Sequence, residues 1–223
     1  MGYYIELDKI TIDDYCKKLE TRYLPPSRMI LKDKMDERFD YFKNIGIKNV
    51  KGLIQLLRKK DKFAELSKVE CFSGDYLPIL LRELNSTLPK PNKISGFNFI
   101  ANETINSLAK IGITNTEKLY DRVVKISDRQ KLADSTEIKY QDILELTKLA
   151  DLSRIKWVGV TYAKMLYDLG VDSVEKVSES DPIDLLARIN QMIKEKNIFK
   201  GTIGLNDVKI LIESASELPL EIE

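Results

Sequence analysis

Three glycines, each followed by an aliphatic residue and a helix-capping residue, constrain the fold of this chain more than any other feature. They lie in the stretches NIGIKNVKGL, KIGITNTEKL and DLGVDSVEKV, at Gly46, Gly112 and Gly170. Glycine suits the left-handed backbone position that closes an α-helix, and Asn or Ser side chains bind the free amides of the next helix. Each stretch therefore predicts a helix, a tight turn and a second helix. The predicted N-caps are Asn49, Asn115 and Ser173.

The apolar residues around these turns have helical spacing. Two stretches, YLPILLREL and DILELTKLADL, each place their regularly spaced apolar residues on one helix face. These residues are Leu77, Leu80, Leu81 and Leu84, with Leu88 just beyond, for the first stretch, and Ile143, Leu146, Leu149 and Ala150 for the second. Strand-like alternation is confined to YYIELDKITI, residues 3–12. Prolines separate the helical segments, and Pro182 behind Asp181 fits the first turn of a capped helix. We therefore predict an all-α fold.

The three stretches also align as copies of one unit. The first two match without a gap at an offset of 66 residues, and the third is offset from the second by 58 at its glycine and by 65 after an insertion. This pattern predicts tandem helical repeats of roughly 60 residues, with chance matching of helix ends as the alternative. The predicted organisation is an N-terminal arm over residues 1–24, with a helix after Thr11, followed by repeats over 25–92, 93–152 and 153–223.

The third copy matches the outline of a helix-hairpin-helix, a module that often holds nucleic-acid phosphates on backbone amides. In RIKWVGVTYAKML, Gly159 stands at the second glycine of that motif, with Val158 before it. Ala163 and Leu166 stand at its small and apolar helix positions, but Trp157 replaces the first glycine. The third copy thus keeps half of the glycine signature.

The other two copies keep none of it. Phe99 and Ala101 occupy the two glycine positions of the second copy, and Asp33 and Met35 occupy them in the first copy. The segment around Asp33 and Met35 is predicted to be continuous helix. Of the three copies, the third is therefore the one that indicates a phosphate-binding turn.

Four stretches, LPPSRMILK, LPKPNKI, LTKLADLSRIKWVG and FKGTIGLNDVK, carry a family resemblance over nearly the full length. With them, the chain resembles an uncharacterised bacterial family, domain of unknown function 4332. The resemblance implies tandem helix-hairpin-helix-like or SAM-like helical repeats. It implies no activity, because the family has none assigned.

The turn before residue 160 has two interpretations. A turn that leads into a helix N-terminus binds phosphate because it aims several backbone amides at one point. Gly159 permits close approach, and nearby cations would add charge. The alternative, which the sequence favours, makes Trp157 a buried core residue and Gly159 a site of close helix packing. The candidate nucleic-acid contacts are Arg154, Lys156, Trp157, Val158, Gly159, Val160 and Lys164.

Two further segments are candidates for backbone contacts. In FKGTIGLND, residues 199–207, Lys200, Gly201 and Gly204 precede a helix with a predicted cap at Asn206, although an ordinary glycine-containing connection is the favoured interpretation. LRKKDKF is the densest basic cluster, and such clusters usually form a solvated helix end. Its cations are Arg58, Lys59, Lys60 and Lys62.

The composition argues against several classes of enzyme. The chain contains no histidine and only two cysteines, Cys16 and Cys71. Triad chemistry and zinc sites built from histidine or thiolate are therefore excluded, and two cysteines provide no disulfide framework. We expect no cofactor, no metal and no catalytic residue. An enzyme that uses carboxylates alone stays possible, because Asp and Glu are plentiful, but no pair of them stands out in the sequence.

The charge leaves two kinds of partner open. The net charge is +1, and it runs from +4 over residues 1–92 through +1 over 93–150 to −4 over 151–223. The leading prediction is a non-enzymatic module that binds a DNA or RNA backbone, although the most hairpin-like segment is acidic. The alternative is a protein-interaction scaffold. No apolar run is long enough to span a membrane, and we expect a cytoplasmic protein.

Overall fold

The computed structural model describes residues 2–198 and 200–223. In this part of the chain every regular element is an α-helix or a short 3-10 helix, and strand-like pairing is limited to two isolated bridges. The all-α prediction is confirmed. The alternating residues 3–12 do not form a strand; they form turns that end in a bridge between Thr11 and Asn49.

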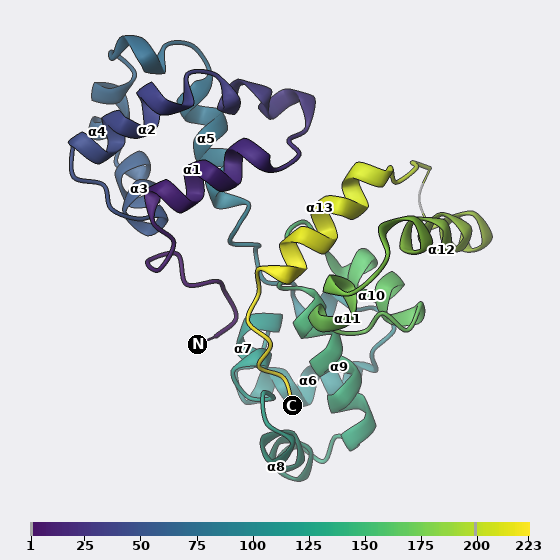
Figure 1. Ribbon diagram of the computed structural model, residues 1–223. Coiled ribbons are helices and arrows are strands. Elements are labelled where there is room, and N and C mark those ends of the chain that lie inside the picture. The colour runs from purple at the N-terminus through teal and green to yellow at the C-terminus, as the bar shows by residue number, and fades with distance from the viewer. Residues whose placement is uncertain (1, 199) are drawn as a thin grey trace. The chain divides into compact units, whose positions relative to one another are not determined.

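The chain divides into two compact units. The N-terminal unit is Glu6–Leu88, and the C-terminal unit is Pro89–Glu223 together with Met1–Ile5. The N-terminal unit contains α1 (Ile12–Thr21), the 3-10 turn η1 (Pro26–Lys32), α2 (Met35–Asn44), α3 (Val50–Arg58), α4 (Lys60–Leu66), η2 (Glu70–Phe72) and α5 (Tyr76–Asn85). Figure 1 labels its five α-helices. The helix predicted after Thr11 is thus confirmed as α1.

The C-terminal unit is built around one apolar core. Buried side chains from each of its helices contribute to that core, and Tyr3 joins it through a hydrogen bond of 2.8 Å between its hydroxyl and Thr116 Oγ1. The elements, seen in Figure 1, are η3 (Ile94–Gly96), α6 (Asn102–Lys110), α7 (Thr116–Tyr120), α8 (Ile126–Thr136), α9 (Tyr140–Leu152), α10 (Val160–Asp168), α11 (Val174–Ser178), α12 (Pro182–Lys196) and α13 (Leu205–Ser216).

The three predicted glycine turns share one geometry. Gly46, Gly112 and Gly170 have φ of 86°, 83° and 76°, the left-handed region that favours glycine. In each turn the next amide donates to the carbonyl five residues back, at 3.0 Å. The N-cap predictions are also confirmed, since the side chains of Asn49, Asn115 and Ser173 accept from the amides of Gly52, Lys118 and Lys176. We call the pairs α2–α3, α6–α7 and α10–α11 the first, second and third hairpins.

The third hairpin differs from the others at the start of its second helix. The amide of Val50 donates to the Ile10 carbonyl at 3.0 Å, and that of Thr116 donates to the Asn92 carbonyl at 2.9 Å. In the third hairpin the amide of Val174 donates instead to a carboxylate oxygen of Asp151, at 2.8 Å. A buried carboxylate therefore replaces a backbone carbonyl, and it lies next to the turn that leads into α10.

The segment around Asp33 and Met35 is not continuous helix, so that prediction is wrong. Lys34 has φ of 46°, and its left-handed backbone separates η1 from α2, which begins at Met35.

Pro182 occupies the first turn of α12 behind its N-cap Asp181, as predicted. Among the helices that the structure describes, none has the length and apolar content to cross a bilayer.

Candidate nucleic-acid interface

The turn that leads into α10, residues 153–159, is the third entry turn. Three successive backbone hydrogen bonds shape it: Arg154 N to Asp151 O at 3.1 Å, Ile155 N to Leu152 O at 3.2 Å, and Val158 N to Ile155 O at 3.1 Å. The side chains of Ile155 and Val158 are buried in the core. These hydrogen bonds and buried side chains hold the backbone on both sides of residue 157. The direction of the residue 157 side chain is therefore set by the backbone conformation of the turn.

Trp157 lies on the surface, which contradicts the favoured interpretation of a buried core residue. Its φ of 66° places it in the left-handed region, and it is 48% exposed. The physical reason is that Ile155 and Val158 already fill the core on either side. The Lys156 ammonium lies 4.6 Å from the centre of the indole ring and forms a cation–π contact with it.

Gly159 does not serve close helix packing, so the second half of that interpretation is also wrong. A Cβ at Gly159 would meet no atom within 4 Å, whereas a Cβ at Gly96 would lie 3.1 Å from Val160 Cγ2. Gly159 is the N-cap of α10 and has no side chain to occupy the first amides of the helix. Those amides have no intrahelical partner and carry the positive end of the helix dipole. The start of α10 is thus open to an anion.

Arg154 cannot reach a phosphate, contrary to the sequence prediction. It is 1% exposed, and its guanidinium donates to Asp151 Oδ1 at 2.7 Å and to the carbonyls of Tyr3 and Pro219 at 3.1 and 2.8 Å. It also lies 4.4 Å from the centre of the Tyr120 ring. Asp151 binds both Arg154 and the start of α11, so Arg154 holds the third hairpin together from inside.

The remaining predicted residues of this turn divide between core and surface. Lys156 is 9% exposed and Val158 is 4% exposed, and the Val158 carbonyl accepts from the Asn92 side chain at 3.2 Å. Gly159 is exposed and Val160 is half-buried. The surface that a ligand meets is therefore made by the indole of Trp157, Gly159 and the first turn of α10.

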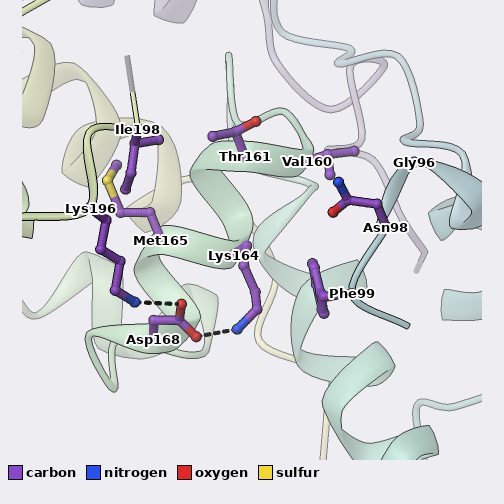
Figure 2. Close-up of a pocket in the computed structure, with 10 residues that line it drawn as sticks. All are labelled: Gly96, Asn98, Phe99, Val160, Thr161, Lys164, Met165, Asp168, Lys196 and Ile198. Atoms are coloured by element: carbon purple, nitrogen blue, oxygen red, sulfur yellow. Dashed lines mark hydrogen bonds and ion pairs between the residues drawn. The ribbon is translucent and has the colours of Figure 1, made fainter. Parts of the chain in front are cut away.

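Lys164 lies one turn further along α10 and is held by three groups. Its ammonium pairs with Asp168, and it lies 4.7 Å from the centre of the Phe99 ring and 5.3 Å from that of Tyr167. Asp168 also accepts from Lys196 at 3.2 Å. Burial acts to raise the pKa of Asp168, but the hydrogen bonds from Lys164 and Lys196 outweigh it and the pKa is lowered. Figure 2 shows both lysines converging on this carboxylate.

The glycine loop before α13 belongs to the same unit as α10. The pKa of the Tyr162 hydroxyl, in the first turn of α10, is raised by burial and then by the charge of Asp207, in the first turn of α13. Lys200, Gly201 and Gly204 are exposed, and the cap of α13 is Gly204 rather than the predicted Asn206, because the Asp207 carboxylate accepts from the Gly204 amide at 2.9 Å. Phe199, the first residue of the predicted loop, lies outside the described residues.

The basic cluster belongs to the other unit. Arg58 ends α3 and donates to Asn85 Oδ1 at 2.5 Å, and Lys62 in α4 pairs with Glu65 at 2.7 Å. Lys59 and Lys60 are exposed at the junction of these helices. The structure therefore groups Trp157, Gly159 and Lys164 within the C-terminal unit and leaves this cluster in the N-terminal unit.

Sequence reasoning missed Lys196 and Asp168, and assigned Phe99 only to a lost glycine position. The spacing of Lys164 and Asp168, four residues apart on one helix, was a usable signal for an ion pair. Lys196 had no such signal, because its contact with Asp168 spans 28 residues. A search of the described residues finds no group of three or more Cys, Asp or Glu arranged to hold a metal ion.

The comparisons with known proteins give one match. A family model described as "Domain of unknown function (DUF4332)" matches residues 99–218, which is more than half of the chain. The family resemblance is confirmed over this range, which begins in the turn before α6 and ends after α13; the stretches LPPSRMILK and LPKPNKI lie outside it. No curated protein and no solved structure matches the chain.

Proposed function

Because this chain belongs to the DUF4332 family, whose description assigns no activity, we propose its function from its own geometry: a non-enzymatic protein that binds the nucleic-acid backbone through the third entry turn. One observation carries most of the weight. Trp157 stands where a helix-hairpin-helix has its first glycine, and it takes the left-handed backbone that glycine favours while 48% of the residue stays exposed. A non-glycine residue is strained there, and burial does not compensate for that strain.

Two kinds of contact follow from this arrangement. The open first turn of α10 offers backbone amides and the helix dipole to a phosphate, and Gly159 leaves the approach free of a side chain. The exposed indole offers a face to a base or sugar, as aromatic residues do in proteins that bind single strands. The Lys156 ammonium lies against the indole ring. We therefore expect modest affinity and a log–log salt slope below about 1, since a cation that contacts a phosphate contributes about 0.7 to 0.9 and Lys156 is only 9% exposed.

We also propose that the hairpins belong to three diverged tandem repeats, helix-hairpin-helix-like or SAM-like, over residues 25–92, 93–152 and 153–223. The shared glycine turns and N-caps support this proposal. So does the last helix of each repeat, where the aligned positions are all buried at 3% exposure or less: Leu80, Leu146 and Leu211, then Leu84, Ala150 and Ala215. Diverged copies of one helical unit are expected to keep the same helix positions buried, as these aligned residues are.

The alternative function is a protein-interaction scaffold. Ile45 and Ile111, each just before the glycine of its hairpin, are 45% and 49% exposed. Ile45 lines a cavity of about 260 Å³ with Leu66 of α4, and Ile111 lines one of about 400 Å³ with Leu132 of α8. Two apolar residues exposed at equivalent positions favour a protein partner that contacts the first two hairpins through these residues.

The proposed backbone binding is tested through the indole itself. Trp157 is the only tryptophan of the chain, so its fluorescence reports on the third entry turn. Adding a short duplex or a single strand at low salt should change the emission, and Gly159→Ala should weaken the interaction by crowding the amides. Lys110→Ala, an exposed lysine in the last turn of α6, is the matched control and should bind as wild type does. If the emission stays unchanged and fluorescence anisotropy of a labelled strand shows no binding, backbone binding by the third entry turn is contradicted and the protein-interaction scaffold becomes the better proposal.

A further inference from the structure

A cavity of about 350 Å³ lies beside the third entry turn. Residues 96–99 form one wall, α10 forms the floor, and Lys196 with Ile198 closes the far side, as the close-up in Figure 2 shows. The volume is at the lower end of the range of about 300–1,000 Å³ typical of small-ligand sites. The first turn of α10, at Val160 and Thr161, borders this cavity and directly follows Gly159. A ligand held at the open start of α10 therefore has the cavity next to it.

One end of the cavity is cationic. Lys164 and Lys196 approach Asp168 from two sides, and Asp168 is the only carboxylate among the described residues that line the cavity. Two ammonium groups share one carboxylate, so the cluster carries one net positive charge. Each ammonium has three N–H donors, and the pairing with Asp168 uses only part of them. The cluster is therefore suited to accept one further anionic group.

The other end is aromatic and polar. Phe99 is 38% exposed, and the Lys164 ammonium lies against its ring, which links the aromatic wall to the cationic end. Asn98 and Thr161, both exposed, add an amide and a hydroxyl to the lining. An amide and a hydroxyl each donate and accept hydrogen bonds, which is what the edge of a heterocyclic base requires. An inorganic anion would use the lysines alone and leave the rest of the cavity without a function.

We infer that this cavity binds an unpaired nucleotide, with the base against Phe99 and the phosphate on Lys164 and Lys196. The inference rests on the proposed function and narrows it, because a base inside a duplex cannot reach such a cavity. The same chemistry is offered by a free mononucleotide and by one nucleotide of a single strand. An unpaired base can stack on an aromatic side chain, whereas a base within a duplex is already stacked and paired, so we expect single strands to bind more tightly than duplex.

The test uses thymidine monophosphate, a short oligothymidylate and a blunt duplex, each titrated into the full chain and followed by amide chemical shifts. Shifts at Asn98, Phe99 and Thr161 are expected with the first two ligands, and weaker ones with thymidine or inorganic phosphate. Lys196→Ala should reduce the affinity for thymidine monophosphate by about fivefold or more, the loss of one charge-assisted contact. Lys194→Ala, on the same turn of α12 and exposed, is the matched control and should leave the affinity unchanged.

The outcomes separate this inference from the proposed function. If duplex changes the Trp157 emission while no nucleotide shifts the cavity residues, and Phe99→Leu binds single strands as wild type does, the cavity inference is overturned and backbone binding stands. If thymidine monophosphate binds in the cavity but neither strand binds, the cavity is a mononucleotide site and backbone binding is overturned. If nothing binds, both are overturned.

Discussion

The entry turns of the second and third hairpins have one backbone frame and different side chains. The second entry turn, residues 95–101, matches the third at an offset of 58 residues. Both turns bury their first and last apolar residues, Phe97 and Ile100 in one and Ile155 and Val158 in the other. The frame of the second consists of Gly96 N to Lys93 O at 2.9 Å, Phe97 N to Ile94 O at 3.1 Å and Ile100 N to Phe97 O at 2.9 Å, which correspond one by one to the bonds of the third.

Three substitutions within this frame change what the turn can do. Arg154 stands at the position of Gly96, so a buried guanidinium network replaces a close glycine contact. Trp157, with its left-handed backbone, stands at the position of Phe99, which has no positive φ. Gly159 replaces Ala101 as the N-cap. The comparison teaches that the frame specifies a turn of this shape, whereas exposure of the helix start depends on the residues placed in it.

The largest expected effect is at Arg154. Arg154→Leu should lower the free energy of unfolding by about 3–5 kcal/mol, because it leaves the Asp151 carboxylate buried without its partner. Gly96→Ala at the equivalent position should change it little, since its Cβ meets only a side-chain methyl of the half-buried Val160. Urea unfolding of both variants measures the difference. Equal losses at the two positions would show that the guanidinium network is not what distinguishes the third turn.

The next effect separates the two aromatic residues. Trp157→Gly should be more stable than Trp157→Ala by about 1 kcal/mol, because alanine in the left-handed region carries a penalty that glycine escapes. The order should reverse at Phe99, where Phe99→Ala should be the more stable variant. Thermal unfolding of these four variants decides the matter. The same order at both positions would mean that the two turns do not differ in backbone conformation.

A reciprocal exchange of the N-caps should have opposite signs. Gly159→Ala should destabilise the protein by about 0.5–1 kcal/mol, because glycine is preferred over alanine at an N-cap. Ala101→Gly should stabilise it by a similar amount. The first variant is also expected to bind nucleic acid less tightly. Should Gly159→Ala keep its affinity in the folded state, the open start of α10 is not the contact surface.

The sequence was sufficient to predict what depends on local chemistry. The left-handed glycines at Gly46, Gly112 and Gly170 and the caps at Asn49, Asn115 and Ser173 follow from backbone sterics and amide satisfaction within a few residues. The all-α class follows from helical spacing in the same way.

The candidate site depended on contacts between distant residues. Arg154 was interpreted as a surface cation because nothing local shows that Tyr3 and Pro219 place their carbonyls around it. Trp157 was interpreted as core because large aromatic residues are usually buried, and the residues that fill that core in its place became visible only in the fold. The contact between Lys196 and Asp168 joins residues 28 positions apart, so no local pattern predicts it.

The smallest expected effect is a difference in acid sensitivity between the two hairpins. Asp168 and Asp172 of the third hairpin are each bound by two lysines, whereas the equivalent positions of the second are Lys110 and Thr114. Burial acts to raise the pKa of each carboxyl, but the hydrogen bonds from the lysines prevail and both pKa values lie below the ordinary 3.8. Carboxyls with a lowered pKa contribute stability that is present above 3.8 and is lost as the pH falls through the folded-state value.

Amide hydrogen exchange can resolve this difference because the two hairpins contain matched probes. The Val171 amide donates to the Leu166 carbonyl, and the Ile113 amide donates to the Leu108 carbonyl, both at 3.0 Å in equivalent turns. As the pH is lowered from 5 to 3, the protection of Val171 should fall relative to that of Ile113, by no more than the roughly 1 kcal/mol that partly exposed ion pairs contribute. Asp172→Asn should remove part of the change. Since both amides lie in the same unit, global acid unfolding would affect them equally, and a constant ratio of protection would show that the lysine-bound carboxylates do not stabilise the third hairpin.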